Sequence, residues 1–182
     1  MKMDFFEVID KRRSIRKYLS KEIPDGVLKK ILEAANKAPS AMNEQPWEFI
    51  VVKDKNLKGK LREIYSEARE KLNFYKQDAS FLGNATLILA LADKSKSSPI
   101  ISTAMAVENM LLAATALGLG ANCMTSPITL EEDANLVKGI FNIPKNYEVI
   151  LLVAVGYPDE KPEPKPKRPA EEIIHYNRFG RK

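Results

Sequence analysis

The chain has 182 residues, of which 45% are hydrophobic and 29% charged, and its formal net charge is +5. This composition excludes disordered, fibrous and collagen-like classes, and we expect one globular domain over residues 1–182. The single cysteine excludes a disulfide within the chain and a cysteine-based zinc site, so no metal site is expected. The N-terminus lacks a signal-peptide pattern, and polar side chains interrupt the longest apolar segment, residues 100–119. We therefore expect a cytoplasmic protein without a membrane partner.

The first third of the chain predicts three helices and one strand. Residues 3–11 alternate apolar and charged side chains at the spacing of a short amphipathic helix. Residues 23–40 contain a second helix that begins near one proline and ends before another. The run PWEFIVVKD (46–54) predicts a strand, and residues 57–72 predict an outer helix with one apolar stripe.

Two continuous apolar runs, residues 84–93 and 147–158, predict strands that helices cover on both faces. Between them, Pro99 opens a long helix that is apolar nearly all round and ends on Gly118 and Gly120. We expect this helix to be central and buried, with both glycines at its C-cap.

The last third predicts one more helix and then an arm. The helix covers residues 130–141, with Thr129 as its cap. The proline-rich stretch DEKPEPKPKRP (159–169) cannot continue a helix or a strand and should run extended for about 30 Å. It is either a disordered tail or an arm that docks, and the apolar residues of IIHYNRF (173–179) favour docking. The lone histidine, His175, is interpreted as a surface or packing residue.

A basic cluster, KRRSIRKY (11–18), follows the first helix and admits three interpretations. It could bind nucleic acid, form a solvated helix end favoured by the helix dipole, or hold one phosphate. The third interpretation rests on guanidinium forks and a hydroxyl that match phosphate geometry, namely those of Arg12, Arg13, Ser14 and Arg16.

A second polar stretch, APSAMNEQPWEF (38–49), lies between a predicted helix and a predicted strand. Ser40, Asn43 and Gln45 offer hydroxyl and amide groups suited to the edge of a planar heterocycle. Its two prolines would hold the loop in one shape, and Trp47 would anchor it to the core. The alternative is a polar loop beside a core tryptophan.

Motifs for covalent catalysis are absent from the sequence. It has neither a G-x-S-x-G elbow nor a P-loop. The stretch GLGANC (118–123) matches only part of a dinucleotide fingerprint and follows a helix instead of a strand, so we reject that interpretation. If the protein is an enzyme, we expect a cofactor to carry the chemistry and no side chain to act as nucleophile.

Four segments in the same order resemble the flavin-dependent nitroreductase family: RRSIRKY, APSAMNEQPWEF, AATALGLG and VAVGYPDEKPEPKPKRPAEEIIHYNRF. The resemblance spans nearly the whole chain. It implies an α+β fold with a mixed central sheet flanked by helices, and a homodimer that exchanges the C-terminal arm, residues 158–182. It also implies two FMN molecules at the dimer interface.

The resemblance assigns cofactor-binding residues in four groups. The FMN phosphate and its neighbouring atoms would be held by Arg12, Arg13, Ser14 and Arg16. The isoalloxazine ring would be reached from the other subunit by Pro39, Ser40, Ala41 and Asn43, to which we add Gln45 for its amide. A loop near flavin N5 would contain Asn122, Cys123, Met124, Thr125 and Ser126. The arm would close on the phosphate through Lys167 and Arg168, with the register relative to Lys165 left open.

The implied activity is hydride transfer from NADH or NADPH through flavin N5 to a nitroaromatic, a quinone or a similar small-molecule acceptor. A specialised relative, either a reductive dehalogenase or a flavoprotein with another electron donor, is the alternative within the fold. A basic nucleic-acid-binding module is disfavoured because the aromatic residues fall on apolar stripes, so no nucleic-acid partner is expected. Cys123 has either a redox role or, as we expect, the role of a small buried residue.

Overall fold

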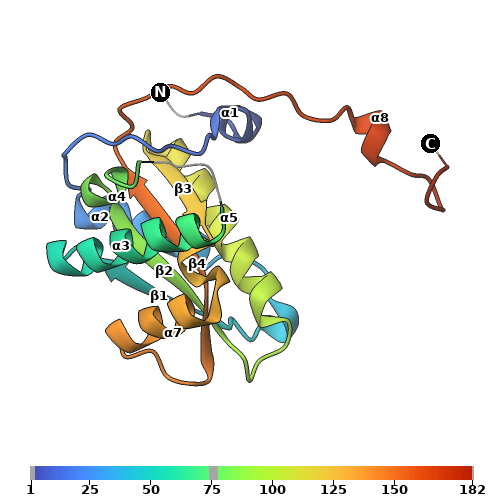
Figure 1. Cartoon of the computed structure of the whole chain (residues 1–182). Coiled ribbons are helices and arrows are strands. Elements are labelled where there is room, and N and C mark those ends of the chain that lie inside the picture. Colours follow the sequence, from blue (N-terminus) through green and yellow to red (C-terminus); the bar gives the residue numbers. More distant parts are fainter. Residues whose placement is uncertain (1–2, 74–77, 182) are drawn as a thin grey trace.

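A four-stranded sheet forms the centre of the computed structural model, which describes residues 3–73 and 78–181 (Figure 1). Its strand order is β1-β2-β4-β3. The strands are β1 (Trp47–Val52), β2 (Thr86–Asp93), β3 (Gly120–Met124) and β4 (Tyr147–Gly156). The three strands that the sequence predicts, β1, β2 and β4, are confirmed.

Helices cover both faces of this sheet. One face carries α2 (Asp25–Ala35) and α5 (Pro99–Ala116). The other face carries α3 (Lys55–Lys71), α4 (Phe81–Asn84), α6 (Ser126–Thr129) and α7 (Glu131–Ile140). Before them, α1 (Phe5–Lys11) lies at the end of the molecule where the arm begins (Figure 1).

The two core layers follow from the period-two alternation of the central strands. Ile88 and Ala90 point to the layer of α2 and α5, whereas Leu87 and Leu89 point to the opposite layer. All four side chains are fully buried, and each buried leucine or isoleucine contributes roughly 1.5–3 kcal/mol to folding. The apolar runs of the sequence therefore reflect strands buried on both faces.

The sheet is antiparallel between all neighbouring described strands, so the expected mixed sheet is wrong. The pairing of Val52 with Leu87 shows the reason. The connection between β1 and β2 starts and finishes at the same end of the sheet, which makes the second strand run back beside the first. Within residues 3–73 and 78–181, parallel pairing is confined to one bridge between Ser14 and Ala121.

The end of α5 confirms one glycine cap and contradicts the other. Gly118 has a left-handed φ of 74° and donates its N–H to Thr115 O at 3.0 Å, while Leu119 donates to Ala114 O at 2.8 Å. These two bonds are the Schellman pattern, which requires a left-handed residue after the helix. Gly120 is not part of the cap. It begins β3 (Gly120–Met124), where a loop was expected over residues 122–126.

One side of α5 is buried and its outer side is exposed, so the expected buried helix is confirmed only in part. Ile101 is 65% exposed and Met105 is also exposed, whereas Ala106 and Met110 are buried against the core. α5 is long and apolar enough to cross a membrane by length and composition alone. Because its other side packs on α2 and the sheet, we interpret it as a core helix with one apolar face uncovered in the single chain.

Thr129 does not cap α7, contrary to expectation. It ends α6 instead, and its hydroxyl donates to Thr125 O at 2.9 Å. Leu130 occupies the N-cap position without a side-chain hydrogen bond, and Glu131 and Glu132 lie in the first turn. The error arises because a short helical turn directly precedes α7, and its side-chain bond uses the threonine.

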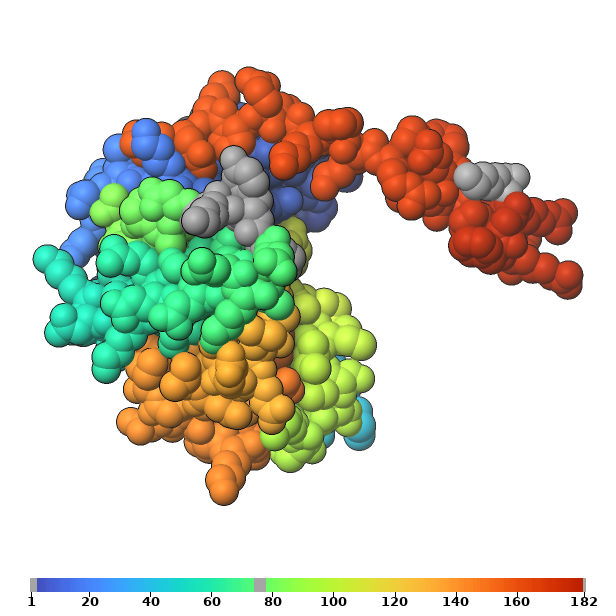
Figure 2. All heavy atoms as spheres, viewed as in Figure 1, coloured from blue at the N-terminus to red at the C-terminus, as the bar shows by residue number. Residues whose placement is uncertain are grey.

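The arm runs extended from residue 159 to residue 169, as the prolines predict. It then forms a short helix that the sequence did not predict, α8 (Ala170–Ile173). Figure 2 shows its first part lying over the N-terminal segment and its last part projecting clear of the body. The projecting part makes local contacts such as that between the rings of His175 and Phe179, whose centroids are 4.4 Å apart. Ile173, Ile174 and Tyr176 are exposed there, so the docking surface that the sequence predicts is not supplied by the body of the same chain.

Candidate functional site

The basic cluster lies along the free edge of β3. Ser14 forms the parallel bridge with Ala121, and Ile15 N–H donates to Ala121 O at 3.0 Å. This approach requires glycine at position 120, because a Cβ there would lie 2.6 Å from Ile15 Cγ1. The glycine interpreted as a helix cap therefore serves to seat the cluster on the sheet.

The start of the arm pairs with the end of the same cluster. Leu19 N–H donates to Tyr157 O at 2.9 Å, and Asp159 N–H donates to Lys17 O at 2.9 Å. The Lys17 ammonium lies 3.3 Å from Asp159 Oδ2. These contacts direct the following arm residues across the arginines.

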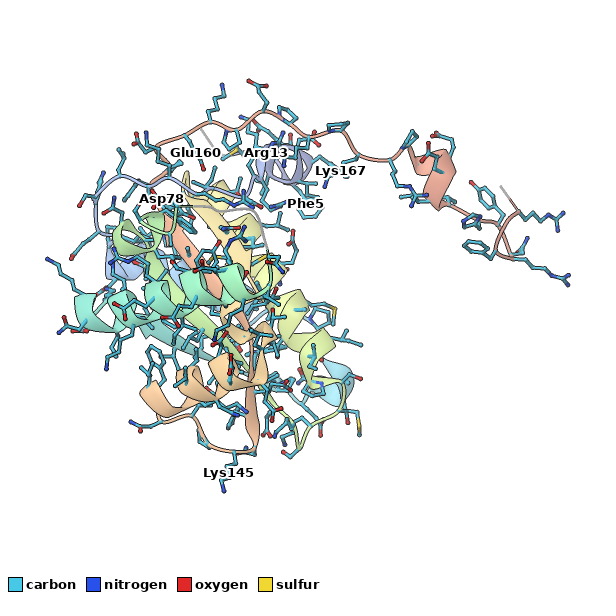
Figure 3. The ribbon with its side chains drawn as sticks, in the orientation of Figure 1. Phe5, Arg13, Asp78, Lys145, Glu160 and Lys167 are labelled. Atoms are coloured by element: carbon cyan, nitrogen blue, oxygen red, sulfur yellow. The ribbon has the colours of Figure 1, made fainter. Side chains whose placement is uncertain are left out.

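One cavity of about 420 Å³ lies between the cluster and the arm. Its cationic and hydroxyl lining comes from two segments about 150 residues apart: Arg12, Arg13, Ser14, Arg16, Lys165 and Lys167. Figure 3 shows Arg13 and Lys167 beside α1, with Glu160 nearer the start of the arm. The cationic side chains outnumber the lining carboxylates, which are those of Asp10 and Glu163. The cavity therefore has the charge of an anion site.

The arginines of this cavity keep unused hydrogen-bonding capacity. Arg13 Nη1 donates to the carbonyl oxygens of Asp10 and Arg12 at 2.6 and 2.8 Å, but its Nε is buried without a partner in the described part of the chain. Arg12 Nε is 3.9 Å from Glu108 Oε1, and Arg16 Nη1 donates to Ser14 O at 3.3 Å. A bound dianion with several acceptor oxygens fits this donor set.

The basic residues of the arm have different neighbours in the single chain. Lys165 and Lys167 line the cavity, whereas Arg168 does not. Arg168 Nε lies 3.3 Å from Glu172 Oε2, and its Nη2 donates to Glu172 O at 3.1 Å. The structure therefore separates the expected basic pair, with only its lysine at the cavity.

The second polar stretch forms a tight loop between α2 and β1. Ala41–Asn43 make one 3-10 turn, and Ser40 Oγ accepts the Gln45 N–H at 3.0 Å. Gln45 Nε2 donates to Asn43 O at 3.0 Å. Pro39 is exposed and Ala41 half-buried. The predicted loop is thus present, with part of its amide and hydroxyl capacity used internally.

Trp47 anchors this loop as predicted. Its ring is 6% exposed, and its Nε1–H donates to Asn36 Oδ1 at 2.9 Å. Because the indole N–H has a partner, the buried ring leaves no unsatisfied donor.

In the single chain the loop lies at the start of α5, whereas the cavity lies beside its second half. The Ser97 N–H, just before α5, bonds to Glu44 of the loop, whereas Arg12 of the cavity lies beside Glu108, and Arg13 shares a second cavity with Thr115 near the end of α5. α5 has 18 residues and is therefore about 27 Å long. One chain does not bring the two predicted groups together.

The residues after Gly120 alternate in exposure as a strand requires. Asn122, Met124 and Ser126 are buried, while Cys123 and Thr125 are exposed. The expectation that Cys123 is buried is wrong, because its side chain faces away from the core. Partial desolvation and the Glu108 carboxylate raise the pKa of the Cys123 thiol, against the opposing charge of Arg12. A raised pKa leaves less of the thiol in its nucleophilic thiolate form.

Residues that the sequence interpretation missed lie where segments distant in the chain meet. Glu160 accepts a hydrogen bond from the Arg16 N–H, and Glu163 and Asp10 line the cavity. The stretch GYPDEKP held no signal for these contacts, since pairing of the arm with the cluster is a tertiary feature.

Comparison with known proteins points to one family. The sequence model described as "Nitroreductase family" matches residues 9–157. A relative from Methanothermobacter thermautotrophicus, with the provisional name NADH dehydrogenase/NAD(P)H nitroreductase, is 35% identical over 165 residues that cover 88% of this chain and 81% of that protein. An iodotyrosine deiodinase of Thermotoga neapolitana is 33% identical over 195 residues, covering 98% and 100%. A crystal structure of an oxidised iodotyrosine deiodinase bound to FMN and 3-iodo-L-tyrosine has a TM-score of 0.84 at 30% identity, covering 96% and 99%.

Proposed function

This chain belongs to the nitroreductase family of flavin oxidoreductases, and from this premise we propose that it uses FMN to pass hydride from NADH or NADPH to a nitroaromatic, quinone or similar acceptor. The observation that carries the proposal is the cationic cavity, in which two distant basic segments converge. A terminal phosphate is the group on FMN that matches this charge.

The residues at the cavity would hold the FMN phosphate. Arg12, Arg13 and Arg16 supply guanidinium donors, and Ser14 supplies a hydroxyl. The unpartnered Nε of Arg13 supports this assignment, because a buried donor without an acceptor costs free energy that a phosphate oxygen would offset. Lys167 and Lys165 would close over the phosphate from the arm.

A homodimer would complete the site. Phe5 and Phe6 on α1 and Ile101 and Met105 on α5 leave apolar side chains exposed, and a two-fold interface would bury the same patch on both subunits. We call residues 39–46 the ring-binding loop. Such an interface would bring the ring-binding loop of one subunit to the cavity of the other. The projecting end of the arm, residues 170–181, would pack its apolar side chains on the partner.

When bound, FMN supplies the hydride transfer, first as acceptor from the nicotinamide and then as donor to the substrate. The chain's own groups bind and orient it. The loop of Ser40 and Asn43 would face the polar edge of the ring, and the arginines would fix its phosphate end. No side chain of this set is required to form a covalent bond, in agreement with the raised pKa of the Cys123 thiol.

The colour of the purified protein tests the proposal. We expect the absorption bands of oxidised flavin, with bleaching when NADH or NADPH is added without oxygen and recovery when a nitroaromatic or a quinone follows. Protein that is colourless and takes up no added FMN would contradict the proposal.

Reductive dehalogenation is the second candidate, and a specific observation favours it. The iodotyrosine deiodinase relative matches nearly the full length of both chains. In this reaction two electrons and a proton replace the carbon–iodine bond of the ring with a carbon–hydrogen bond and release iodide. Iodide release from 3-iodo-L-tyrosine by the dithionite-reduced protein would favour dehalogenation, whereas turnover of nitroaromatics without iodide release would favour nitroreduction.

A further inference from the structure

Glu44 joins the proposed ring-binding loop to a second loop 53 residues further along the chain. Its Oε2 accepts the backbone N–H of Ser97 at 2.6 Å. The side chain is half-buried, and the hydrogen bond to Ser97 lowers the pKa of Glu44, so the carboxylate is ionised at neutral pH. The bond is charge-assisted and therefore stronger than one between neutral groups.

The loop that receives Glu44 is itself held in place. Asp93 Oδ1 accepts the N–H and the hydroxyl of Ser95 at 3.0 and 2.8 Å, and Asn146 Nδ2 at 3.3 Å. The Asp93 N–H donates to Pro46 O at 2.8 Å. Residues 93–97 thus form a platform beside β1 that is bonded to the ring-binding loop at two points, Pro46 and Glu44.

The ring-binding loop needs such support because its backbone is unfavourable for its residues. Met42, Asn43 and Gln45 have left-handed φ values of 52°, 55° and 47°. Non-glycine residues adopt this region only where their surroundings compensate for the cost. Glu44 lies between them, and its carboxylate is the loop's charged attachment to the platform.

We propose that Glu44 is a positioning residue for the flavin ring: its bond to the Ser97 N–H holds Ser40, Asn43 and Gln45 in the conformation that binds the ring. This inference rests on the proposed function, because it assigns Glu44 to the same FMN site. The charges that face Glu44 from the platform are those of Lys96 and Asp93. Glu44 itself would not touch the reacting atoms.

The test compares E44A and E44Q with a matched control, E48Q, in which an exposed carboxylate on β1 is neutralised. FMN is added to each apoprotein while flavin fluorescence is followed, and the visible spectrum and midpoint potential of each complex are recorded. We expect E44A to weaken FMN binding by about tenfold, as loss of a charge-assisted hydrogen bond implies. We expect E44Q, which keeps an acceptor oxygen, to weaken it less, and E48Q to match the wild type.

The flavin readouts separate positioning from a general structural role. A displaced loop changes the spectrum and potential of the bound flavin, whereas a loss of stability alone lowers the unfolding temperature and leaves both unchanged. E44Q keeps the test valid if E44A folds poorly. Wild-type FMN affinity, spectrum and potential in the folded Glu44 variants would overturn this inference alone. Failure of the wild type to bind FMN would overturn the proposed function and this inference with it.

Discussion

The carboxylate of Glu160 accepts a hydrogen bond from the backbone N–H of Arg16, across 144 positions of sequence. This bond lies beside the Lys17–Asp159 ion pair and the bridge between Tyr18 and Pro158. The three contacts attach the start of the arm to the basic cluster. This attachment directs the lysines further along the arm to the cavity.

Replacing Glu160 by alanine should loosen the arm. The charge-assisted bond to the Arg16 N–H is lost, and we expect the initial rate of tryptic cleavage after Lys167, the one lysine of residues 161–167 that no proline follows, to rise by about tenfold. Cleavage products identified by mass spectrometry measure this. The control is E171A, which removes an exposed carboxylate from α8. Equal cleavage rates in the two variants would show that Glu160 does not hold the arm.

Replacing Arg12 and Arg16 together by alanine should release FMN while the fold persists. Both side chains line the cavity, with Arg16 exposed and Arg12 half-buried, and loss of two charge-assisted contacts implies roughly a hundredfold weaker binding. Fluorescence titration with FMN measures affinity, and circular dichroism checks the fold. The matched control, K29A/K30A, removes two exposed cations from α2. Unchanged FMN affinity in the arginine variant would mean that the phosphate binds elsewhere.

Gly120→Ala should destabilise the protein, because the new Cβ would lie 2.6 Å from Ile15 Cγ1 in a buried contact. We expect a loss of about 1–3 kcal/mol in the free energy of unfolding, as for overpacked core positions. Gly59→Ala is the control: it lies inside α3 with no atom within 4 Å of its new Cβ, and should gain up to about 1 kcal/mol. Urea unfolding at one protein concentration measures both, and equal stability of the two variants would contradict the close approach.

Ile101→Glu should abolish the proposed dimer. Ile101 lies on the uncovered face of α5, where an interface would bury the new charge at a cost of several kcal/mol. We expect a monomer by sedimentation velocity, with loss of FMN because the ring-binding loop of the partner is removed. Leu136→Glu on α7 changes another exposed apolar side chain away from that face and should leave the assembly intact. A monomeric wild type would contradict the shared site itself.

Elements with a local signal were predictable from the sequence. β2 and β4 are apolar runs buried on both faces, and Gly118 marks the end of α5 because only a left-handed residue continues the chain there. The basic cluster and the polar loop could be recognised as candidate binding segments because each gathers several hydrogen-bonding side chains within a short stretch of sequence.

Elements defined by distant partners were not predictable. β3 has the sequence GANCM, whose first three residues have little preference for strands, and it is a strand because it pairs with β4 and receives Ile15. The same reason explains the wrong assignment of Gly120 and the exposure of Cys123, whereas Thr129 is used by the local turn of α6.

The sequence by itself determined the family, the two buried strands, and the residue types that would hold a phosphate and a flavin ring. Only the tertiary structure decided that Lys167 and not Arg168 lines the cavity with the arginines, that Glu44 bonds to Ser97 and Glu160 to Arg16, and that the two predicted groups lie apart in one chain. The physical reason is the separation along the sequence between the residues that interact. Helix caps and burial patterns involve residues a few positions apart, whereas the strand pairing and ion pairs of this site join segments up to about 150 positions apart.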